Sequence, residues 1–257
     1  MNFTVLTIFP ELMDAFFDCG IVRRAVESRT ISCRATDIRD FAEGRHRQVD
    51  DRPYGGGNGM VMKPESLAAA IDHAKAEQPM ARTVLLSPQG RVFTQQEAER
   101  MAAAGGELIL ICGRYEGVDE RICETRIDDE ISIGDYVLTG GEVAAMIVIE
   151  ATTRLIPGAL GGEDSAQRDT FQDGLVEHAH YTRPPVFEEK AVPDVLLSGN
   201  HAAIDKWRLE NALMRTLLKR PDLLENRLLK GEEQTILREW CRRIEAIIGG
   251  ESDLISE

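Results

Sequence analysis

The first 160 residues alternate between short apolar runs and longer stretches whose apolar residues have helical spacing. Runs at 3–9, 83–87 and 107–113 have the length and composition of strands buried in a parallel sheet. The stretch at 94–106 begins with a threonine suited to capping a helix and ends in two glycines. This alternation predicts an α/β domain with a mostly parallel sheet over residues 1–160.

Two further segments are assigned from their own patterns. Pro10 is expected to start a helix, and an amphipathic stretch continues from it through Glu27. Residues 31–39 alternate with period two, which predicts a strand.

The character of the sequence changes at Gly161. Residues 161–172 are polar and have no apolar periodicity, which indicates a linker or mobile loop between domains. From residue 173 to residue 257 the apolar spacing is helical, so we expect a small helical domain there.

The formal net charge of −14 argues against nucleic-acid binding, because proteins that bind nucleic acids usually have a basic surface. Two basic clusters, at 39–52 and 201–230, point the other way. Such clusters are also typical of a solvated helix face. Charge therefore permits RNA binding without demonstrating it.

Compartment and membrane association follow from what the sequence contains. Apolar runs stay below the roughly 18 residues that a membrane span requires, and the N-terminus lacks the pattern of a signal peptide. The five cysteines are scattered and odd in number, which argues against a disulfide framework or a zinc site. We expect a cytoplasmic protein that does not bind a membrane.

A glycine-rich loop, DDRPYGGGNGMVMKP at 50–64, first suggests a phosphate site. Its lysine does not stand where a P-loop requires it, and the glycines do not match the dinucleotide fingerprint. Three strand ends, LLSPQGR, LICGRYEGVDE and SIGDYVLTGGE, are more informative. They offer bare backbone groups at the carboxyl ends of predicted strands, which favours an adenine ligand without a polyphosphate.

Several long blocks resemble one known family. DDRPYGGGNGM, LSPQGR, ICGRYEG, SIGDYVLTGGE, HYTRPP and VLLSGNHAAIDKWR, in that order, resemble the bacterial tRNA (guanine-N1)-methyltransferases, from the first strand to about Glu225. Asn58 departs from the family, where proline is expected. The resemblance implies a SPOUT-type sheet with a deep trefoil knot and a homodimer with a shared active site. It also implies S-adenosylmethionine as the methyl donor and guanine 37 of tRNA as the target.

The resemblance assigns the three strand-end turns to the methyl donor. The implied cofactor-binding residues are Leu86, Ser87, Pro88, Gly113, Ile133, Gly134, Asp135, Tyr136, Val137, Leu138, Gly140 and Gly141. This agrees with the expectation from the residues themselves, because S-adenosylmethionine contains adenine and no phosphate.

Guanine N1 carries a proton at neutral pH, so methylation there requires a base at N1 and a positive charge near O6. The resemblance implies Asp169 as the general base and makes Arg154 the candidate cation. A free aspartate has a pKa of about 3.9, far below that of guanine N1. Burial of Asp169 and a cation at O6 are the two effects that could close this gap. Arg154 also has an explanation without catalysis. It stands at the C-terminal end of a predicted helix, where the helix macrodipole favours a positive charge.

Magnesium and tRNA contacts are further expectations from the resemblance. Glu116, Asp169 and Glu177 are candidate Mg²⁺ ligands, since this hard cation prefers carboxylate oxygens. The candidate contacts to tRNA or its target base are His46, Asp50, Arg52, Lys206 and Arg208.

Other functions stay open at this point. A non-catalytic RNA-binding relative and a methyltransferase of another RNA are the alternatives that share the fold. A nucleotide hydrolase is disfavoured, because the P-loop lysine is missing.

Overall fold

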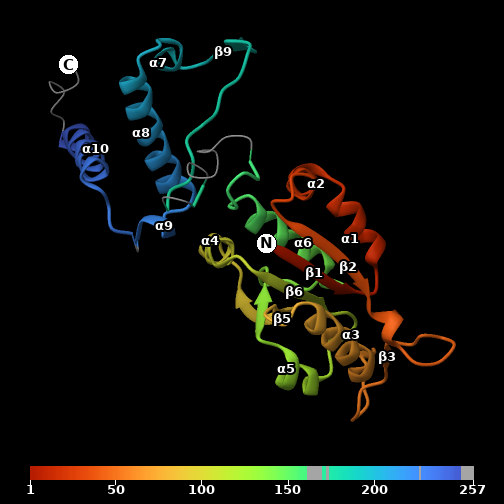
Figure 1. The fold of residues 1–257 in the computed structure, drawn as a ribbon. Helices are drawn as coiled ribbons and strands as arrows, with labels where there is room; N and C mark the ends of the chain where they lie inside the picture. Colours follow the sequence, from red (N-terminus) through yellow and green to blue (C-terminus); the bar gives the residue numbers. More distant parts are fainter. Residues whose placement is uncertain (161–169, 172–173, 226, 250–257) are drawn as a thin grey trace. The chain divides into compact units, whose positions relative to one another are not determined.

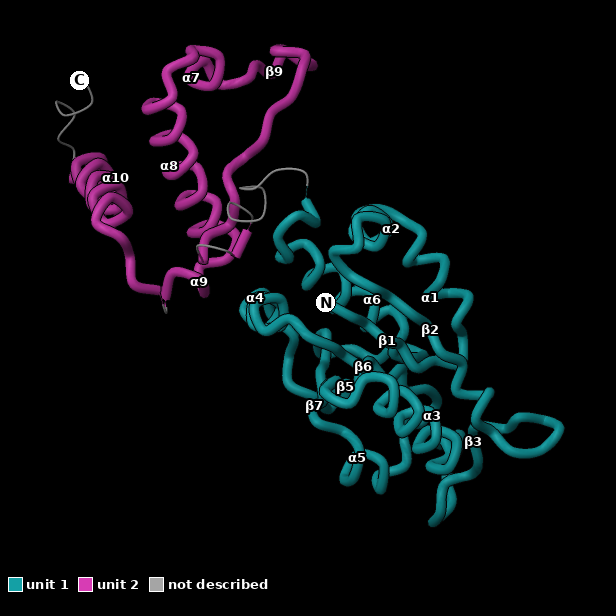
Figure 2. The backbone as a smooth tube through the Cα atoms, in the orientation of Figure 1, with its two compact units in different colours: residues 1–163 teal, residues 164–257 magenta. Residues whose placement is uncertain are grey.

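The computed structural model describes residues 1–160, 170–171, 174–225 and 227–249. The chain divides into two compact units, Met1–Glu163 and Asp164–Glu257 (Figure 2). Residues 161–169 and 172 of the predicted linker lie outside the described residues.

Unit 1 is built on a five-stranded sheet in the order β2-β1-β6-β5-β7 (Figure 1). Every pair of neighbouring strands in it is parallel, which confirms the predicted α/β architecture with a parallel sheet. The strands are β1 (Asn2–Thr7), β2 (Ser32–Asp37), β5 (Arg82–Val92), β6 (Glu107–Cys112) and β7 (Asp129–Ser132).

Helices cover both faces of this sheet, and the alternation of strand side chains explains why. Phe3 and Val5 of β1 belong to one apolar core, and Leu6 belongs to the other. The first core is closed by α1 (Pro10–Phe17), α2 (Gly20–Glu27), α4 (Gln95–Ala104) and α6 (Glu142–Thr153). The second core is closed by the 3₁₀ helix η1 (Ile38–Phe41), α3 (Pro64–Glu77) and α5 (Glu120–Arg126). Burial on both faces is what makes the strands nearly continuous apolar runs.

Two predicted elements of the N-terminal region differ in the structure. The amphipathic stretch from Pro10 through Glu27 is two helices, because Gly20 has a φ of +58° that breaks the regular helix. The strand predicted to reach residue 39 ends at Asp37. Its carboxylate accepts a hydrogen bond from the Arg39 N–H (2.8 Å) and so caps η1 instead.

Strand β5 is longer than the predicted run at 83–87, and it is interrupted. Leu86 and Arg91 both pair with Ile131 of β7, so Ser87–Gly90 leaves the ladder as a bulge. Beyond it, α4 has the predicted start, because the Thr94 hydroxyl accepts a hydrogen bond from Glu97 N–H (3.3 Å).

Unit 2 contains a short hairpin and four helices among its described residues. Residues 183–193 contain three prolines and form β8 (Val186–Phe187) and β9 (Lys190–Ala191) rather than a helix. The helices are α7 (Asp194–Leu197), α8 (His201–Lys219), α9 (Asp222–Glu225) and α10 (Gly231–Gly249). Leu175, Leu213 and Ile236 lie in the small core that joins α8 to α10.

All five cysteines are free thiols, as their spacing predicts. Among the described residues, no helix combines the length and the apolar composition needed to cross a membrane.

Candidate functional site

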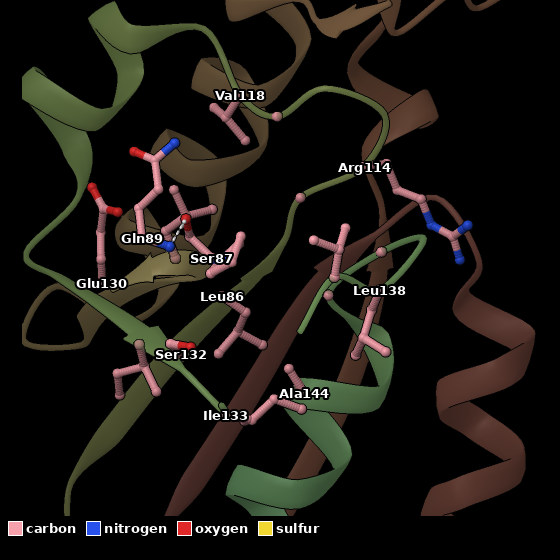
Figure 3. A pocket seen from close by; sticks show the side chains of 18 of the residues that line it. Leu86, Ser87, Gln89, Arg114, Val118, Glu130, Ser132, Ile133, Leu138 and Ala144 are labelled. Atoms are coloured by element: carbon pink, nitrogen blue, oxygen red, sulfur yellow. Dashed lines mark hydrogen bonds between the residues drawn. The ribbon is translucent and has the colours of Figure 1, made fainter. Parts of the chain in front are cut away.

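A cavity of about 290 Å³ opens at the bulge of β5 and at the carboxyl ends of β6 and β7 (Figure 3). Its walls are residues 85–89 at the bulge of β5, residues 113–118 after β6, and residues 130–134 and 136–141 at and after the end of β7, with Ala144 of α6 beside them. The three strand-end turns singled out in the sequence therefore meet in one pocket. Carboxyl ends of parallel strands are where open α/β sheets bind ligands.

The first wall is the bulge in β5. The Gln89 N–H donates to Ser87 Oγ (3.2 Å), which holds the bulge in a tight turn (Figure 3). A Cβ on Gly90 would overlap the main chain of Glu130 and Ile131. Gly90 lies within the LSPQGR block, but it is not among the predicted site residues, and its role depends on a contact that only the folded sheet creates.

The other walls meet where the chain returns to β6. From Ile133 to Gly141 it passes from β7, on one side of β5, to the end of β6 on the other side. The Gly141 N–H donates to the Gly113 carbonyl (2.9 Å), and Arg114 forms a bridge with Gly140. A Cβ on Gly141 would lie 2.7 Å from Cys112 Cα, so a larger residue would push the returning chain away.

A buried carboxylate fixes this junction. Glu142 is 1% exposed, and it accepts hydrogen bonds from the Thr7 hydroxyl (2.7 Å) and from Arg114 Nη2 (3.0 Å). The Arg114 guanidinium also stacks over the Phe9 ring, 4.4 Å from its centroid. Thr7 and Arg114 are both needed for the stability of the fold, since a buried carboxylate without partners is strongly destabilising. Thr7 lies 135 residues from Glu142, and nothing in the sequence pairs the two.

The charges around the cavity disfavour a phosphate ligand. Among the described residues that line it, the charged ones are Arg114, Glu116, Glu120 and Glu130, and Arg114 is paired with Glu142. Burial raises the pKa of the Cys123 thiol, also in the lining, to about 11. That thiol stays protonated at neutral pH and does not supply a thiolate nucleophile. The pocket suits a neutral or cationic ligand.

Most of the predicted cofactor residues line the pocket. The predicted residues that line the pocket are Leu86, Ser87, Pro88, Gly113, Ile133, Gly134, Tyr136, Val137, Leu138, Gly140 and Gly141. Asp135 is exposed and does not line the pocket. Glu116 lines it too, whereas Arg154 is exposed at the C-terminal end of α6. Glu177 lies in unit 2, and Asp169 lies outside the described residues.

The glycine-rich loop ends beside the pocket. It connects β3 (Asp50–Asp51) to β4 (Val61–Met62), and four of its glycines have positive φ. The Glu116 N–H donates to the Met60 carbonyl (2.9 Å), and a Cβ on Gly59 would overlap the Glu116 side chain. The glycines therefore let the loop approach the wall formed by 114–118.

The predicted tRNA contacts lie on the surface of their units. His46 and Arg52 are exposed, and Asp50 is half-buried in β3. In α8, Lys206 lies 3.8 Å from Glu210 and Arg208 lies 3.2 Å from Asp205. These pairs are those of a solvated helix face, and a role in tRNA binding stays a prediction.

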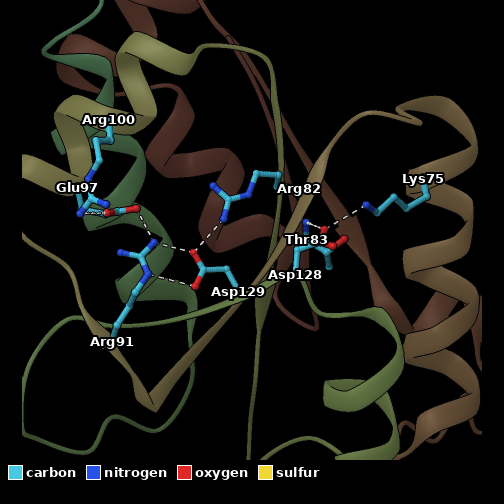
Figure 4. A network of polar contacts seen from close by, with 8 residues as sticks. All are labelled: Lys75, Arg82, Thr83, Arg91, Glu97, Arg100, Asp128 and Asp129. Atoms are coloured by element: carbon cyan, nitrogen blue, oxygen red, sulfur yellow. Dashed lines mark hydrogen bonds and ion pairs between the residues drawn. The ribbon is translucent and has the colours of Figure 1, made fainter.

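Ion pairs hold β5 on either side of the bulge (Figure 4). Arg91, after the bulge, contacts Asp129 of β7 (2.6 Å) and Glu97 of α4. At the start of β5, the Asp128 carboxylate accepts the Thr83 N–H (2.7 Å) and lies 3.2 Å from Lys75 Nζ. The two parts of β5 that flank the bulge are thus held by Asp129 of β7 and by Asp128, the residue before β7.

Comparison with known proteins identifies the family. Residues 1–226 match the family model described as tRNA (Guanine-1)-methyltransferase TrmD. The chain belongs to this family. Relatives named tRNA (guanine-N(1)-)-methyltransferase include one from Desulfatibacillum aliphaticivorans, 58% identical over 96% of this chain and 94% of the relative. Another, from Geobacter metallireducens, is 52% identical over 93% of this chain and 97% of the relative.

Family membership confirms the resemblance drawn from the sequence blocks. The matched region ends at residue 226, close to the limit of about Glu225 inferred from the motifs. It includes both the pocket of unit 1 and the first described helices of unit 2.

Replacing Gly90 with alanine tests the bulge. We expect Gly90→Ala to lower the free energy of unfolding by about 1–3 kcal/mol, because the added methyl overpacks against the β7 backbone. Gly113→Ala is the matched control in the same pocket, since its Cβ would meet its nearest neighbour at an ordinary 3.6 Å. Urea unfolding should be followed by circular dichroism. Tryptophan fluorescence would report on unit 2, where both tryptophans lie, whereas Gly90 lies in unit 1. Equal losses in the two variants would contradict the assignment.

Replacing Asp128 with asparagine tests the support of β5. Burial raises the pKa of this carboxyl, but the Thr83 N–H and Lys75 outweigh burial and leave the pKa below its ordinary 3.8. Because the pKa of Asp128 is lower in the folded protein than in the unfolded chain, its carboxylate stabilises the fold above pH 3.8. This stabilisation is lost as the pH falls through the pKa of the folded state. The Asp128 side chain is 47% exposed, so solvent screens its charge, and we expect Asp128→Asn to cost about 0.5–1.5 kcal/mol at pH 7.

The same unfolding measurement in acid completes this test. The difference between Asp128→Asn and the unsubstituted protein should shrink once the pH is below 3.8. Asp72→Asn, which removes an exposed pair with Arg126, should cost less than about 1 kcal/mol at pH 7. A difference for Asp128→Asn that is independent of pH would rule out the carboxylate as its cause.

Proposed function

We propose that the protein transfers a methyl group from S-adenosylmethionine to N1 of guanine 37 in tRNA. The observation that carries the proposal is the pocket at the bulge of β5 and the ends of β6 and β7, whose walls are the sequence blocks shared with the family. The relatives' name, tRNA (guanine-N(1)-)-methyltransferase, supports the reaction and the substrate.

The residues of the pocket fit S-adenosylmethionine. The cavity of about 290 Å³ is at the lower end of the range for small-molecule sites. Backbone groups of Leu86, Gly113 and Leu138 can bind the edges of an adenine ring, and the glutamates in the lining suit a cationic sulfonium. When bound, this cofactor supplies the methyl group. The protein's part is to bind the cofactor and to orient its methyl group.

Deprotonation of guanine N1 is assigned to Asp169, and stabilisation of the charge on O6 to Arg154. Support comes from the family match, which includes both positions, and from the chemistry that the reaction requires. An aspartate can serve as this base when burial raises its pKa, and an arginine at O6 lowers the pKa of the guanine.

Magnesium is assigned to Glu116, Asp169 and Glu177. The donor set fits the ion, since carboxylate oxygens are what Mg²⁺ prefers. Glu116 belongs to the pocket lining, which supports a role close to the bound substrates. Bound there, the ion would supply positive charge next to them.

The remaining parts of the proposal concern architecture. Residues 1–160 form the SPOUT domain, 161–172 the flexible linker and 173–257 the helical tRNA-binding domain. The return of the chain from β7 across β5 to β6 supports the deep trefoil knot.

A homodimer with a shared active site is part of the same proposal. The adjacent helices α1 and α6 expose the large apolar side chains of Leu12, Val143 and Ile147. This exposure supports the proposal that a second copy of the chain covers this face in the dimer. The free cysteines and the tRNA substrate support a cytoplasmic location.

Transfer of labelled methyl to two tRNA transcripts tests the function. The transcripts differ by guanine or adenine at position 37, and we expect label on the guanine transcript alone, recovered as 1-methylguanosine. Equal labelling of both, or of neither, would overturn the proposal. In the same assay, excess chelator should lower the rate and added Mg²⁺ should restore it. If the chelator leaves the rate unchanged, magnesium has no part in the reaction.

Replacing Asp169 with alanine tests the base. We expect the rate of methyl transfer to fall by about 10²–10⁴-fold, the usual contribution of a general base. The affinity for S-adenosylmethionine, measured by calorimetry, should barely change. Asp164→Ala, a second aspartate from the same polar stretch, is the control and should keep its activity. Normal methylation by Asp169→Ala would exclude Asp169 from the mechanism.

A further inference from the structure

A segment of unit 2 just after residue 174 is fixed along α8 by three hydrogen bonds to its backbone. The Val176 N–H donates to Thr216 Oγ1 (2.9 Å), and the Ala179 N–H donates to Asn211 Oδ1 (2.7 Å). Arg215 Nε donates to the Glu177 carbonyl (3.0 Å). All three partners belong to one helix, so the backbone of this segment is held in place independently of what its own side chains do.

Two histidines on this segment share one side. His178 and His180 are separated by a single residue, Ala179. Their ring centroids lie 4.6 Å apart. Trp207 of α8 lies beside them, with its centroid 6.2 Å from that of His178. Packing between the helix and the pair therefore limits the rotation of His178.

Glu177 completes a group of three possible ligands. Its Oε1 lies 2.9 Å from His180 Nε2, and ligand atoms of Glu177, His178 and His180 all lie within 4.8 Å of one another. Tetrahedral coordination at about 2.0–2.1 Å separates ligand atoms by about 3.4 Å, which small side-chain rotations can reach. Arg215 contacts the main-chain carbonyl of Glu177, so this bond does not occupy the carboxylate.

The donor types select the metal. Two imidazoles with one carboxylate are typical of zinc and its first-row neighbours, whereas Mg²⁺ takes oxygen ligands. His178 Nδ1 lies 3.2 Å from the Ala179 carbonyl oxygen. When Nδ1 donates there, the lone pair is on Nε2, which is the arrangement that orients metal-binding histidines.

We propose that Glu177, His178 and His180 bind one divalent transition-metal ion of the zinc class. Three protein ligands leave a coordination position for water. The site uses residues of unit 2 alone. It shares Glu177 with the carboxylate set proposed for magnesium, and its two imidazoles are what distinguish it from that set. Metal binding is measured directly, so the result can be interpreted whether or not the proposed methyl transfer holds.

Calorimetric titration of the chelator-treated, full-length protein with Zn²⁺ tests the site. We expect one equivalent to bind, and millimolar Mg²⁺ to leave the titration in place. His180→Gln and His178→Gln should each weaken binding by at least about tenfold. His201→Gln, which changes an exposed histidine at the start of α8, is the matched control and should bind as the unsubstituted protein does.

A spectrum with Co²⁺ distinguishes this site from the exposed thiols Cys19 and Cys241. Ligation by nitrogen and oxygen gives visible bands without a thiolate-to-metal band in the near ultraviolet. Such a thiolate band, or unchanged affinity in both His178→Gln and His180→Gln, would overturn the proposal. Circular dichroism of each variant must match that of the unsubstituted protein, and His178→Ala with His180→Ala serve as second substitutions if glutamine disturbs the fold.

Discussion

The pocket depends on the chain returning to the end of β6 at Gly141. That return is held by the Gly141–Gly113 hydrogen bond and by Glu142, whose buried carboxylate joins Thr7 and Arg114. Because Glu142 is the first residue of α6, the same contact sets where that helix begins and how it lies against the sheet. The cavity wall, the helix and the first strand are therefore fixed by one polar cluster in an otherwise apolar interior.

The opposite wall uses a different device. The β5 bulge is an interruption of sheet pairing, and such a turn needs support on both sides. Arg91 and Asp128 supply it through ion pairs and hydrogen bonds with β7, α4 and the start of β5, while Gly90 lets the bulge lie against the backbone. Polar contacts on either side of the bulge and the close packing of Gly90 together shape this wall of the cavity.

The sequence pattern was sufficient for the sheet and for the place of the pocket, because both depend on local periodicity and on where apolar runs end. It was wrong at Gly20 and at residues 38–39, where a positive φ and an aspartate cap outweighed the pattern. It also missed Gly90, Thr7 and Glu142 as parts of the site. Their roles arise from contacts between strands and from a pair 135 residues apart, which periodicity does not register. Asp169, the proposed general base, was reached through the family resemblance and lies outside the described residues.

The contact between Thr7 and Glu142 also bears on how the protein is made. Thr7 leaves the ribosome 135 residues before its partner Glu142, which follows only after most of unit 1 has been synthesised. Strand β6, the neighbour of β1 in the sheet, also follows about a hundred residues later. A nascent chain therefore keeps β1 without its inner neighbour until β6 emerges, and it keeps the pocket without its last wall until residues 133–141 emerge. A ligand of this pocket can bind the finished domain but cannot guide its early folding.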